Sequence, residues 1–200
     1  MSGERIGLLG GTFDPIHIGH LHLAQAVADV AALDTVLFMP VGSPAHRETH
    51  ASAEDRKEMT QLAIARNTRF EFDGTALEQP APAYTADTLA LLREKRPHDR
   101  FCFIAGIDSL ARSRWRRLDE VAETLEKFYV ARREGVDVAE LAPILSDLAP
   151  ELRARFEIVD VALMDLSSTE IRALVKAGRS IRYLVPDVVA GYIADRSLYR

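Results

Sequence analysis

Short apolar runs alternate with longer segments of helical period along this chain. Residues 5–9, "RIGLL", form one such run, and "LHLAQAVADVAAL" follows it with apolar positions at helical spacing. Those positions are Leu23, Val27, Val30 and Ala31. The same order returns in "TVLFMP" and "SAEDRKEMTQLAIAR", and again in "RFEFDG" and "TADTLALLREKR". We expect Ser52 and Thr85 to be the N-caps of these last two helices, because their short side chains can accept a hydrogen bond from the first turn.

The second half of the chain repeats this order. The expected strands are "RFCFIAG", "KFYVARR" and "FEIVDVAL", and the expected helices are "LDEVAETL", "VAELAPILSDL", "STEIRALVKAG" and "PDVVAGYIADR". Repeated strand-then-helix order predicts an α/β fold: a doubly wound parallel sheet covered on both faces, with a small C-terminal helical part. In such a sheet, ligands bind outside the carboxyl ends of the strands, so we expect the functional site there.

Composition and charge limit the kinds of molecule that this chain is expected to bind. The chain has 200 residues, enough for a single domain, and 25 Lys and Arg against 30 Asp and Glu give a formal charge of -5. No global basic surface is therefore expected for nucleic acid or an anionic membrane, and any phosphate site must be local. The single cysteine, Cys102, lies in an apolar run, which predicts a buried thiol in a reducing compartment. Because no apolar run is long enough for a signal peptide or a membrane span, a cytoplasmic protein is expected.

The stretch "GGTFDPIHIGH" directly follows the first expected strand. Gly10 and Gly11 lack Cβ atoms, so backbone N–H groups there could approach an anion closely at the turn into a helix. His17 and His20 are three positions apart, which puts both imidazoles on one side of a helix that begins near them. Imidazolium donors at the positive end of a helix would form a compact phosphate clamp.

Other interpretations of this stretch stay open at the level of sequence. The glycines could serve only a tight turn, the histidines could be ordinary surface residues, or they could bind zinc together with His22. Against zinc, the pattern H-E-x-x-H is absent and no acidic residue stands at ligand spacing.

A second group of candidate residues lies in "LSSTEIR", near the C-terminal end of the chain. Ser167 and Glu170 have the spacing of a capping box, and Gly178 stands where a helix C′ residue belongs. Capping leaves Thr169 and Arg172 unexplained. Because an Arg in the first turn of a helix opposes the helix dipole, an anionic ligand is a reasonable compensation.

Gly106 and Asp108 stand where the expected strand "RFCFIAG" ends. A carboxylate at the carboxyl end of a parallel strand can accept hydrogen bonds from a ribose. Asp108 could equally be the N-cap of a short helix.

Together these motifs resemble the nucleotidyltransferase superfamily. "GGTFDPIHIGH" is similar to its H-x-G-H motif and "LSSTEIR" to its I-S-x-T-x-I-R motif, whereas the K-M-S-K-S pattern of class I aminoacyl-tRNA synthetases is absent. "PVGSPAHR", "AYTADTL" and "AGIDSLARSRW" extend the similarity to the bacterial nicotinate-nucleotide adenylyltransferase family over essentially the whole chain. The chain departs from that family's pattern at Ala45, Arg116 and Glu134.

The resemblance implies a Rossmann-like nucleotidyltransferase domain over residues 1–200, with helices from about residue 167 completing an ATP site. It also implies adenylyl transfer from ATP to nicotinate mononucleotide, with His17, His20 and Arg172 in catalysis. The implied ATP-binding residues are Gly10, Gly11, Thr12, Phe13, Gly106, Asp108, Ser167 and Thr169. Those implied for nicotinate mononucleotide are Pro44, His46, Arg47, Tyr84, Thr85, Trp115 and Arg116, with the pyridine ring stacked on the tryptophan.

The reaction would need few protein groups. The attacking phosphate oxygen is largely deprotonated at neutral pH, so no general base is required. Mg²⁺ would arrive bound to ATP, without a metal-binding side chain of the protein. Self-association into a homo-oligomer stays open. The alternatives are an adenylyltransferase acting on nicotinamide mononucleotide or phosphopantetheine, a non-catalytic nucleotide sensor, and a zinc hydrolase.

Overall fold

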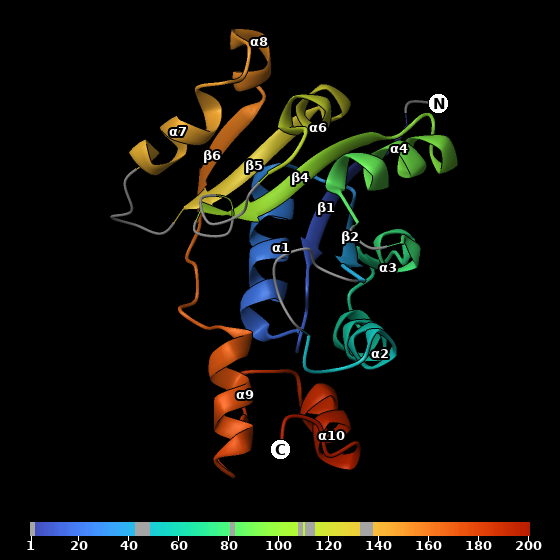
Figure 1. The fold of residues 1–200 in the computed structure, drawn as a ribbon, viewed down its shortest axis with the longest axis vertical. Coiled ribbons are helices and arrows are strands. Elements are labelled where there is room, and N and C mark those ends of the chain that lie inside the picture. The colour runs from blue at the N-terminus through green and yellow to red at the C-terminus, as the bar shows by residue number, and fades with distance from the viewer. Residues whose placement is uncertain (1–2, 43–48, 81–82, 108–109, 111–114, 133–137) are drawn as a thin grey trace.

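The computed structural model describes residues 1–200 apart from 1–2, 43–48, 81–82, 108–109, 111–114 and 133–137. In the described part, six parallel strands form one sheet in the order β3-β2-β1-β4-β5-β6 (Figure 1). The strands are β1 Arg5–Gly11, β2 Thr35–Pro40, β3 Phe70–Phe72, β4 Arg100–Gly106, β5 Lys127–Arg132 and β6 Phe156–Asp160. The predicted α/β fold with a doubly wound parallel sheet is confirmed.

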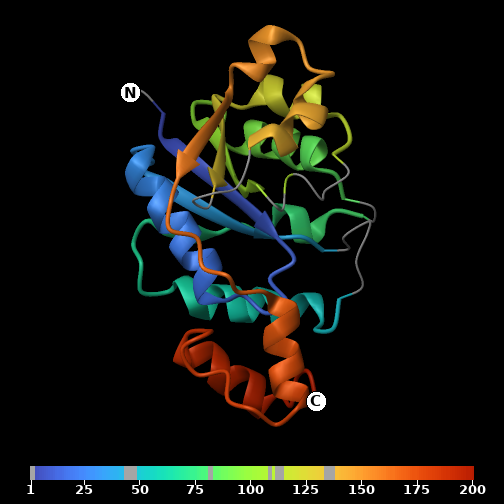
Figure 2. The same cartoon turned by 90° about the vertical axis from the view of Figure 1, so that its left-hand side faces the viewer.

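Helices cover both faces of this sheet (Figure 2). One face packs against α1 Ile18–Val30 and α2 Ala53–Ile64, and the other against α3 Thr75–Glu78, α4 Thr85–Lys95 and α6 Leu118–Thr124. Adjacent strand residues point to opposite faces. Thus Leu9 belongs to the apolar cluster under α1, whereas Leu8 belongs to the cluster under α4. Burial on both faces explains why the strands form continuous apolar runs in the sequence.

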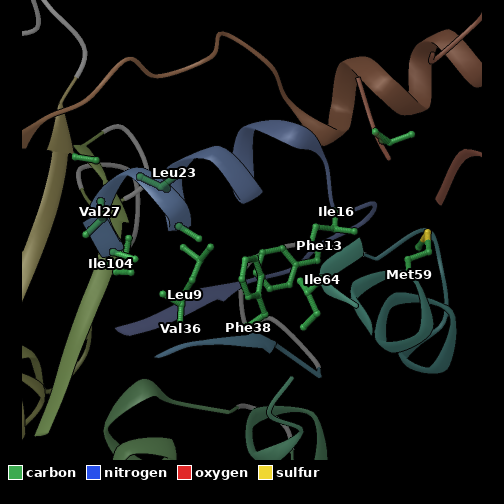
Figure 3. Close-up of a cluster of buried hydrophobic side chains, with 14 of the residues drawn as sticks. Leu9, Phe13, Ile16, Leu23, Val27, Val36, Phe38, Met59, Ile64 and Ile104 are labelled. Carbon is green, nitrogen blue, oxygen red and sulfur yellow. The ribbon is translucent and has the colours of Figure 1, made fainter. Parts of the chain in front are cut away.

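The cluster under α1 and α2 reaches the end of β1, where the Phe13 and Phe38 rings lie 6.0 Å apart (Figure 3). Cys102 in β4 is fully buried, and this burial raises the pKa of its thiol to about 11. The predicted core role of this cysteine is therefore confirmed. Val30, by contrast, is 63% exposed, because the last turn of α1 directs it away from the sheet.

Several predicted helix boundaries change. The Ser52 side chain accepts a hydrogen bond from the Asp55 N–H at 3.0 Å and caps α2 as predicted. The N-cap of α4 is Tyr84, so Thr85 is instead the first helical residue. The prediction of a single helix in "VAELAPILSDL" is also wrong. The chain forms a 3₁₀ turn Val138–Leu141, α7 Ala142–Leu145 and, after that stretch, α8 Pro150–Arg153. Prolines in the first turns of α7 and α8 lack the N–H needed to continue a preceding helix.

Two further helices, α9 Ser168–Lys176 and α10 Asp187–Asp195, pack beside α2 and the start of α1 (Figures 1 and 2). The Ile18 N–H at the start of α1 donates to the Leu184 carbonyl between them at 3.0 Å. The predicted capping box of Ser167 and Glu170 is present, and Gly178 has a φ of 66° just after α9 ends.

Within the described part of the chain, no helix has both the length and the apolar composition to cross a bilayer.

The direction of chain progression reverses between β1 and β4, which lie side by side at the centre of the sheet. Their register pairs Arg5 with Arg100 and Leu8 with Phe103. Continued along both strands, this register brings Gly11 level with Gly106. The carboxyl ends of the two strands therefore meet at a topological switch point, where open parallel sheets bind ligands.

Candidate functional site

The two glycines of the first motif are the last residues of β1, paired with Met39 and Pro40 of β2. They are not the turn itself, and neither has a positive φ; the left-handed conformation falls on Phe13, with a φ of 49°. A Cβ added to Gly11 would lie 2.7 Å from Cε1 of Phe13. Gly11 is therefore required by the packing of a buried aromatic ring that begins the turn.

The histidines of the first motif lie together at the start of α1. His17 is the N-cap, and its imidazole stacks on that of His20 with ring centroids 3.6 Å apart. The Phe13 ring meets His20 edge-on at 5.0 Å. The sequence prediction that both imidazoles lie on one side of the first turn is confirmed by this stacking.

Hydrogen bonding fixes which nitrogen of His20 can donate. The His17 N–H donates to Nδ1 of His20 at 3.2 Å, so the imidazole proton of a neutral His20 resides on Nε2. Nδ1 of His17 is buried and has no hydrogen-bond partner among the described residues. A buried polar atom without a partner is costly, and a ligand group is one way to satisfy it.

Both imidazoles are neutral near pH 7. Burial lowers the pKa of His17 to about 4, an effect partly offset by the Glu170 carboxylate. Burial, together with the neighbouring His17, lowers the pKa of His20 well below its ordinary value. The site as folded thus offers neutral N–H donors in place of the imidazolium donors expected from sequence.

The start of α9 closes against the same turn. Arg172 donates from Nη1 to the Asp14 carbonyl at 2.7 Å and from Nη2 to Oγ1 of Thr169 at 3.3 Å. Oγ of Ser168 donates to the Pro15 carbonyl at 2.8 Å. The structure therefore brings Thr169 and Arg172 to the first motif. Arg172 is the fifth residue of α9, so it begins the second turn and does not lie in the first turn as expected.

The Ser167 side chain takes part in the capping box of α9. Its Oγ accepts from the Glu170 N–H at 3.2 Å and donates to Oε2 of Glu170 at 2.7 Å. Its neighbour Ser168, which sequence reasoning did not single out, is the serine that reaches the first motif. The spacing of the motif in the sequence does not distinguish Ser167 from Ser168. These two adjacent residues at the start of the helix differ in the direction in which their side chains point.

Two buried charged residues that sequence reasoning also missed hold the turn in place. Arg56 in α2 is fully buried and donates to the carbonyls of Thr12, Val41 and Gly42 at 2.8, 2.6 and 2.8 Å. It therefore joins the loops that follow β1 and β2. Asp14 is 3% exposed, and its carboxylate accepts from two backbone N–H groups and one hydroxyl.

A second group of predicted residues lies on the other face of the sheet. Trp115 is half-buried, and its ring meets Phe103 and Phe128 edge-on, at 5.5 Å in each case. Its Nε1 is buried with no hydrogen-bond partner among the described residues. A Cβ on Gly10 would lie 3.5 Å from Cζ of Phe103, so one aromatic ring separates Trp115 from the first motif.

An ion pair joins the tryptophan segment to α4. Arg117 bonds Asp87 in the first turn of α4. This contact holds residues 115–117 beside Tyr84 and Thr85, which precede and begin that helix. Arg116 is exposed and has no hydrogen-bond or ion-pair partner in the described part of the chain. The predicted residues Pro44, His46, Arg47 and Asp108, and the departures Ala45 and Glu134, lie outside the described residues.

Two cavities in the described structure lie away from the first motif. One of about 550 Å³, between the end of α9 and α10, is lined by none of the predicted site residues. Another of about 410 Å³ borders Trp115, Leu118 and α7. Since the first motif lines neither, the arrangement of its donors identifies the site better than cavity size does.

Metal ligation was the remaining alternative for the histidines. In the residues that the structure describes, no group of three or more His, Cys, Asp or Glu side chains is placed to hold a metal ion. The site is built instead from N–H donors and one guanidinium, which suits an anionic ligand.

Known proteins are similar to this chain in sequence and in fold. The cytidylyltransferase-like family model matches residues 8–174. A curated relative from Symbiobacterium thermophilum is 39% identical over 198 residues, covering 98% of this chain and 95% of its own. Another, from Corynebacterium kroppenstedtii, is 43% identical over 200 residues, covering 98% of this chain and 90% of its own. Both are named "Probable nicotinate-nucleotide adenylyltransferase".

A solved structure is similar over the whole fold. Plasmodium falciparum nicotinic acid mononucleotide adenylyltransferase, complexed with NaAD, has a TM-score of 0.77 at 16% identity, covering 98% of this chain and 97% of that one. At this identity the likeness establishes the fold alone. The family match covers most of the chain, and the curated relatives extend over nearly all of it. This chain therefore belongs to the nicotinate-nucleotide adenylyltransferase family of cytidylyltransferase-like proteins.

Proposed function

We propose that this protein transfers the adenylyl group of ATP to nicotinate mononucleotide, giving nicotinate adenine dinucleotide and pyrophosphate in NAD biosynthesis. The observation that carries the proposal, beyond family membership, is the convergence of two segments. Stacked His17 and His20 at the start of α1 and Arg172 in α9 are both anchored to the turn after β1. Neutral donors and one guanidinium at a switch point suit a nucleotide polyphosphate.

Catalysis on this proposal is alignment and charge stabilisation. The mononucleotide phosphate attacks the α-phosphate of ATP without a general base, because it is already ionised. The protein must hold two mutually repelling phosphates in line and stabilise charge that develops on the α-phosphate and on pyrophosphate. Nε2–H of His20, fixed by the His17 N–H, is preorganised to donate there. Arg172 supplies the positive charge.

The remaining assignments follow the same layout. We assign ATP to the end of β1 and to α9, and the helices from about residue 167 would complete its site. The assigned ATP-binding residues are Gly10, Gly11, Thr12, Phe13, Gly106, Asp108, Ser167 and Thr169. We expect Ser168 to act through the Pro15 carbonyl rather than on ATP directly.

We assign the pyridine ring to Trp115, with Tyr84, Thr85 and Arg116 around its carboxylate. The ion pair of Arg117 with Asp87 supports this, since it holds the tryptophan segment beside the start of α4. Aromatic stacking and backbone N–H donors suit a planar carboxylate ligand. Pro44, His46 and Arg47 complete the assignment as expectations from sequence.

Mg²⁺ would enter with ATP, because the described residues hold no cluster of metal-binding side chains. Bound to the phosphates, it would neutralise part of their charge. We further propose a single domain over residues 1–200 in a cytoplasmic protein, without a nucleic-acid or membrane partner.

The proposal is tested by measuring pyrophosphate release from ATP and nicotinate mononucleotide by the purified protein. The expected result is turnover that depends on both substrates and is faster with the acid than with nicotinamide mononucleotide. Faster turnover with the amide or with phosphopantetheine would move the protein to another branch of the adenylyltransferases. Binding of ATP without pyrophosphate release would indicate a nucleotide sensor.

A further inference from the structure

Four hydrogen bonds converge on Asp14, the residue in the middle of the turn after β1. Its carboxylate accepts from the N–H groups of His50 and Ala51 at 2.7 and 3.1 Å. Oδ1 also accepts from the Tyr199 hydroxyl at 2.7 Å. Its carbonyl accepts from Arg172 at 2.7 Å. One residue thus receives donors from three segments that are far apart in the sequence.

The hydroxyl of Tyr199 is held in this position by more than one feature. Burial and the Asp14 carboxylate raise the pKa of the phenol far above its ordinary value, so the group stays a donor. Ser197 and Tyr199 have φ values of 52° and 63°, an unfavourable conformation for residues other than glycine. Such a conformation persists only where surrounding contacts determine it.

Displacement of Asp14 would reach Arg172 directly. The Asp14 carbonyl is the group to which the Arg172 guanidinium is anchored. A shift of about 1 Å in aligned reacting groups can cost up to about a hundredfold in rate.

We propose that Tyr199 is a positioning residue for the adenylyl transfer: its hydroxyl fixes Asp14, and Asp14 in turn fixes Arg172. This inference rests on the proposed function. Tyr199 contacts no substrate in this scheme and acts only through the other two residues. Its effect should therefore appear in kcat and vanish when Arg172 is absent.

The chain contains a matched control. The Tyr192 hydroxyl in α10 donates to Oδ1 of Asp55 in α2 at 2.9 Å, another phenol-to-carboxylate bond made by the C-terminal part of the chain. Asp55 makes no hydrogen bond to residues 10–17 in the described structure. A purely structural role for both hydroxyls predicts the same behaviour for Tyr192→Phe and Tyr199→Phe.

The experiment compares these two variants with the wild type, alone and in an Arg172→Ala background. Steady-state pyrophosphate release gives kcat and both KM values, and thermal unfolding gives Tm. We expect Tyr199→Phe to lower kcat about tenfold and Tyr192→Phe to change it less than about twofold, with similar changes in Tm. In the Arg172→Ala background, Tyr199→Phe should lower kcat no further, because interacting residues are non-additive.

Equal kcat values for the two Phe variants, or a full further loss in the Arg172→Ala background, would overturn the proposal. Hydrogen exchange of the amides of residues 13–20 provides a readout that needs no turnover. It should be about tenfold faster in Tyr199→Phe than in Tyr192→Phe. If the wild type released no pyrophosphate, the proposed function would fail. Unchanged hydrogen exchange in Tyr199→Phe would, independently of turnover, refute the proposal that the Tyr199 hydroxyl fixes Asp14.

Discussion

Arg172 and Asp14 are 158 positions apart, yet Nη1 of Arg172 donates to the Asp14 carbonyl at 2.7 Å. This single contact brings the second motif to the first. It also directs the guanidinium toward the start of α1, where an anion would meet the helix dipole. The following predictions test the parts of this arrangement separately.

Arg172→Ala should lower kcat by about a hundredfold, a loss of about 3 kcal/mol of transition-state stabilisation. The reason is the removal of the positive side chain that joins α9 to the Asp14 carbonyl. Lys176→Ala, on the exposed side of the same helix, is the matched control and should retain wild-type kcat. A variant that raised only the KM for ATP would instead assign Arg172 to ground-state binding.

His20→Ala should also lower kcat by about a hundredfold, because it removes a preorganised Nε2–H donor. His22→Ala, two positions further along α1, serves as the comparison. Steady-state kinetics at saturating substrate give the result. Wild-type kcat in the His20 variant would exclude it from catalysis.

Trp115→Ala should raise the KM for nicotinate mononucleotide by about tenfold, the equivalent of about 1.4 kcal/mol of stacking. The KM for ATP should stay nearly unchanged, since none of the residues assigned to ATP belongs to the tryptophan segment 115–117. Trp115→Phe keeps an aromatic face and should recover most of the affinity. Equal weakening of both substrates would contradict the stacking assignment.

Arg56→Met should lower the free energy of unfolding by about 3 kcal/mol. The guanidinium is fully buried, and its loss removes the donor that it supplies to three carbonyls. Lys57→Met, which breaks only an exposed pair with Glu54, should change stability by less than about 0.5 kcal/mol. Urea denaturation of both variants makes the comparison, and a change below 1 kcal/mol in the Arg56 variant would argue against its bridging role.

The free energy of unfolding should decrease as the pH is lowered from about 6.5 to 4, because of His17. In the unfolded chain this imidazole takes up a proton near pH 6.5, whereas its pKa in the folded state is about 4. Protonation therefore favours unfolding within this window, and at pH 5 the cost is about 2 kcal/mol relative to pH 7. Urea denaturation of wild type and His17→Gln at both pH values should show a smaller decrease in the variant. The exposed His98→Gln should behave like the wild type.

The features predicted from sequence are those set by local spacing. Apolar periodicity predicted the strands of the sheet, and a Ser–Glu spacing of three predicted the capping box at Ser167. The prediction of one helix over 138–148 failed for a local reason as well, since Pro143 interrupts it. The alternation of strands and helices was sufficient for the fold because each strand is buried on both faces.

The residues that support the site were missed because their partners are remote. Ser168 and Tyr199 reach groups 153 and 185 positions away. Arg56 did carry a signal: it lies among the buried positions of α2 with Met59 and Thr60, where a guanidinium is unusual. The neutral state of His17 and His20 could not be predicted either, since it results from burial in the folded protein.

The hydrogen bond between Tyr199 and Asp14 can form only late in the synthesis of this chain by the ribosome. A ribosome releases the first motif early and residue 199 only after every strand of the sheet has been made. Nascent chains that end between Asp160 and Tyr199 contain all six strands of the described sheet but leave the Asp14 carboxylate without its phenolic donor.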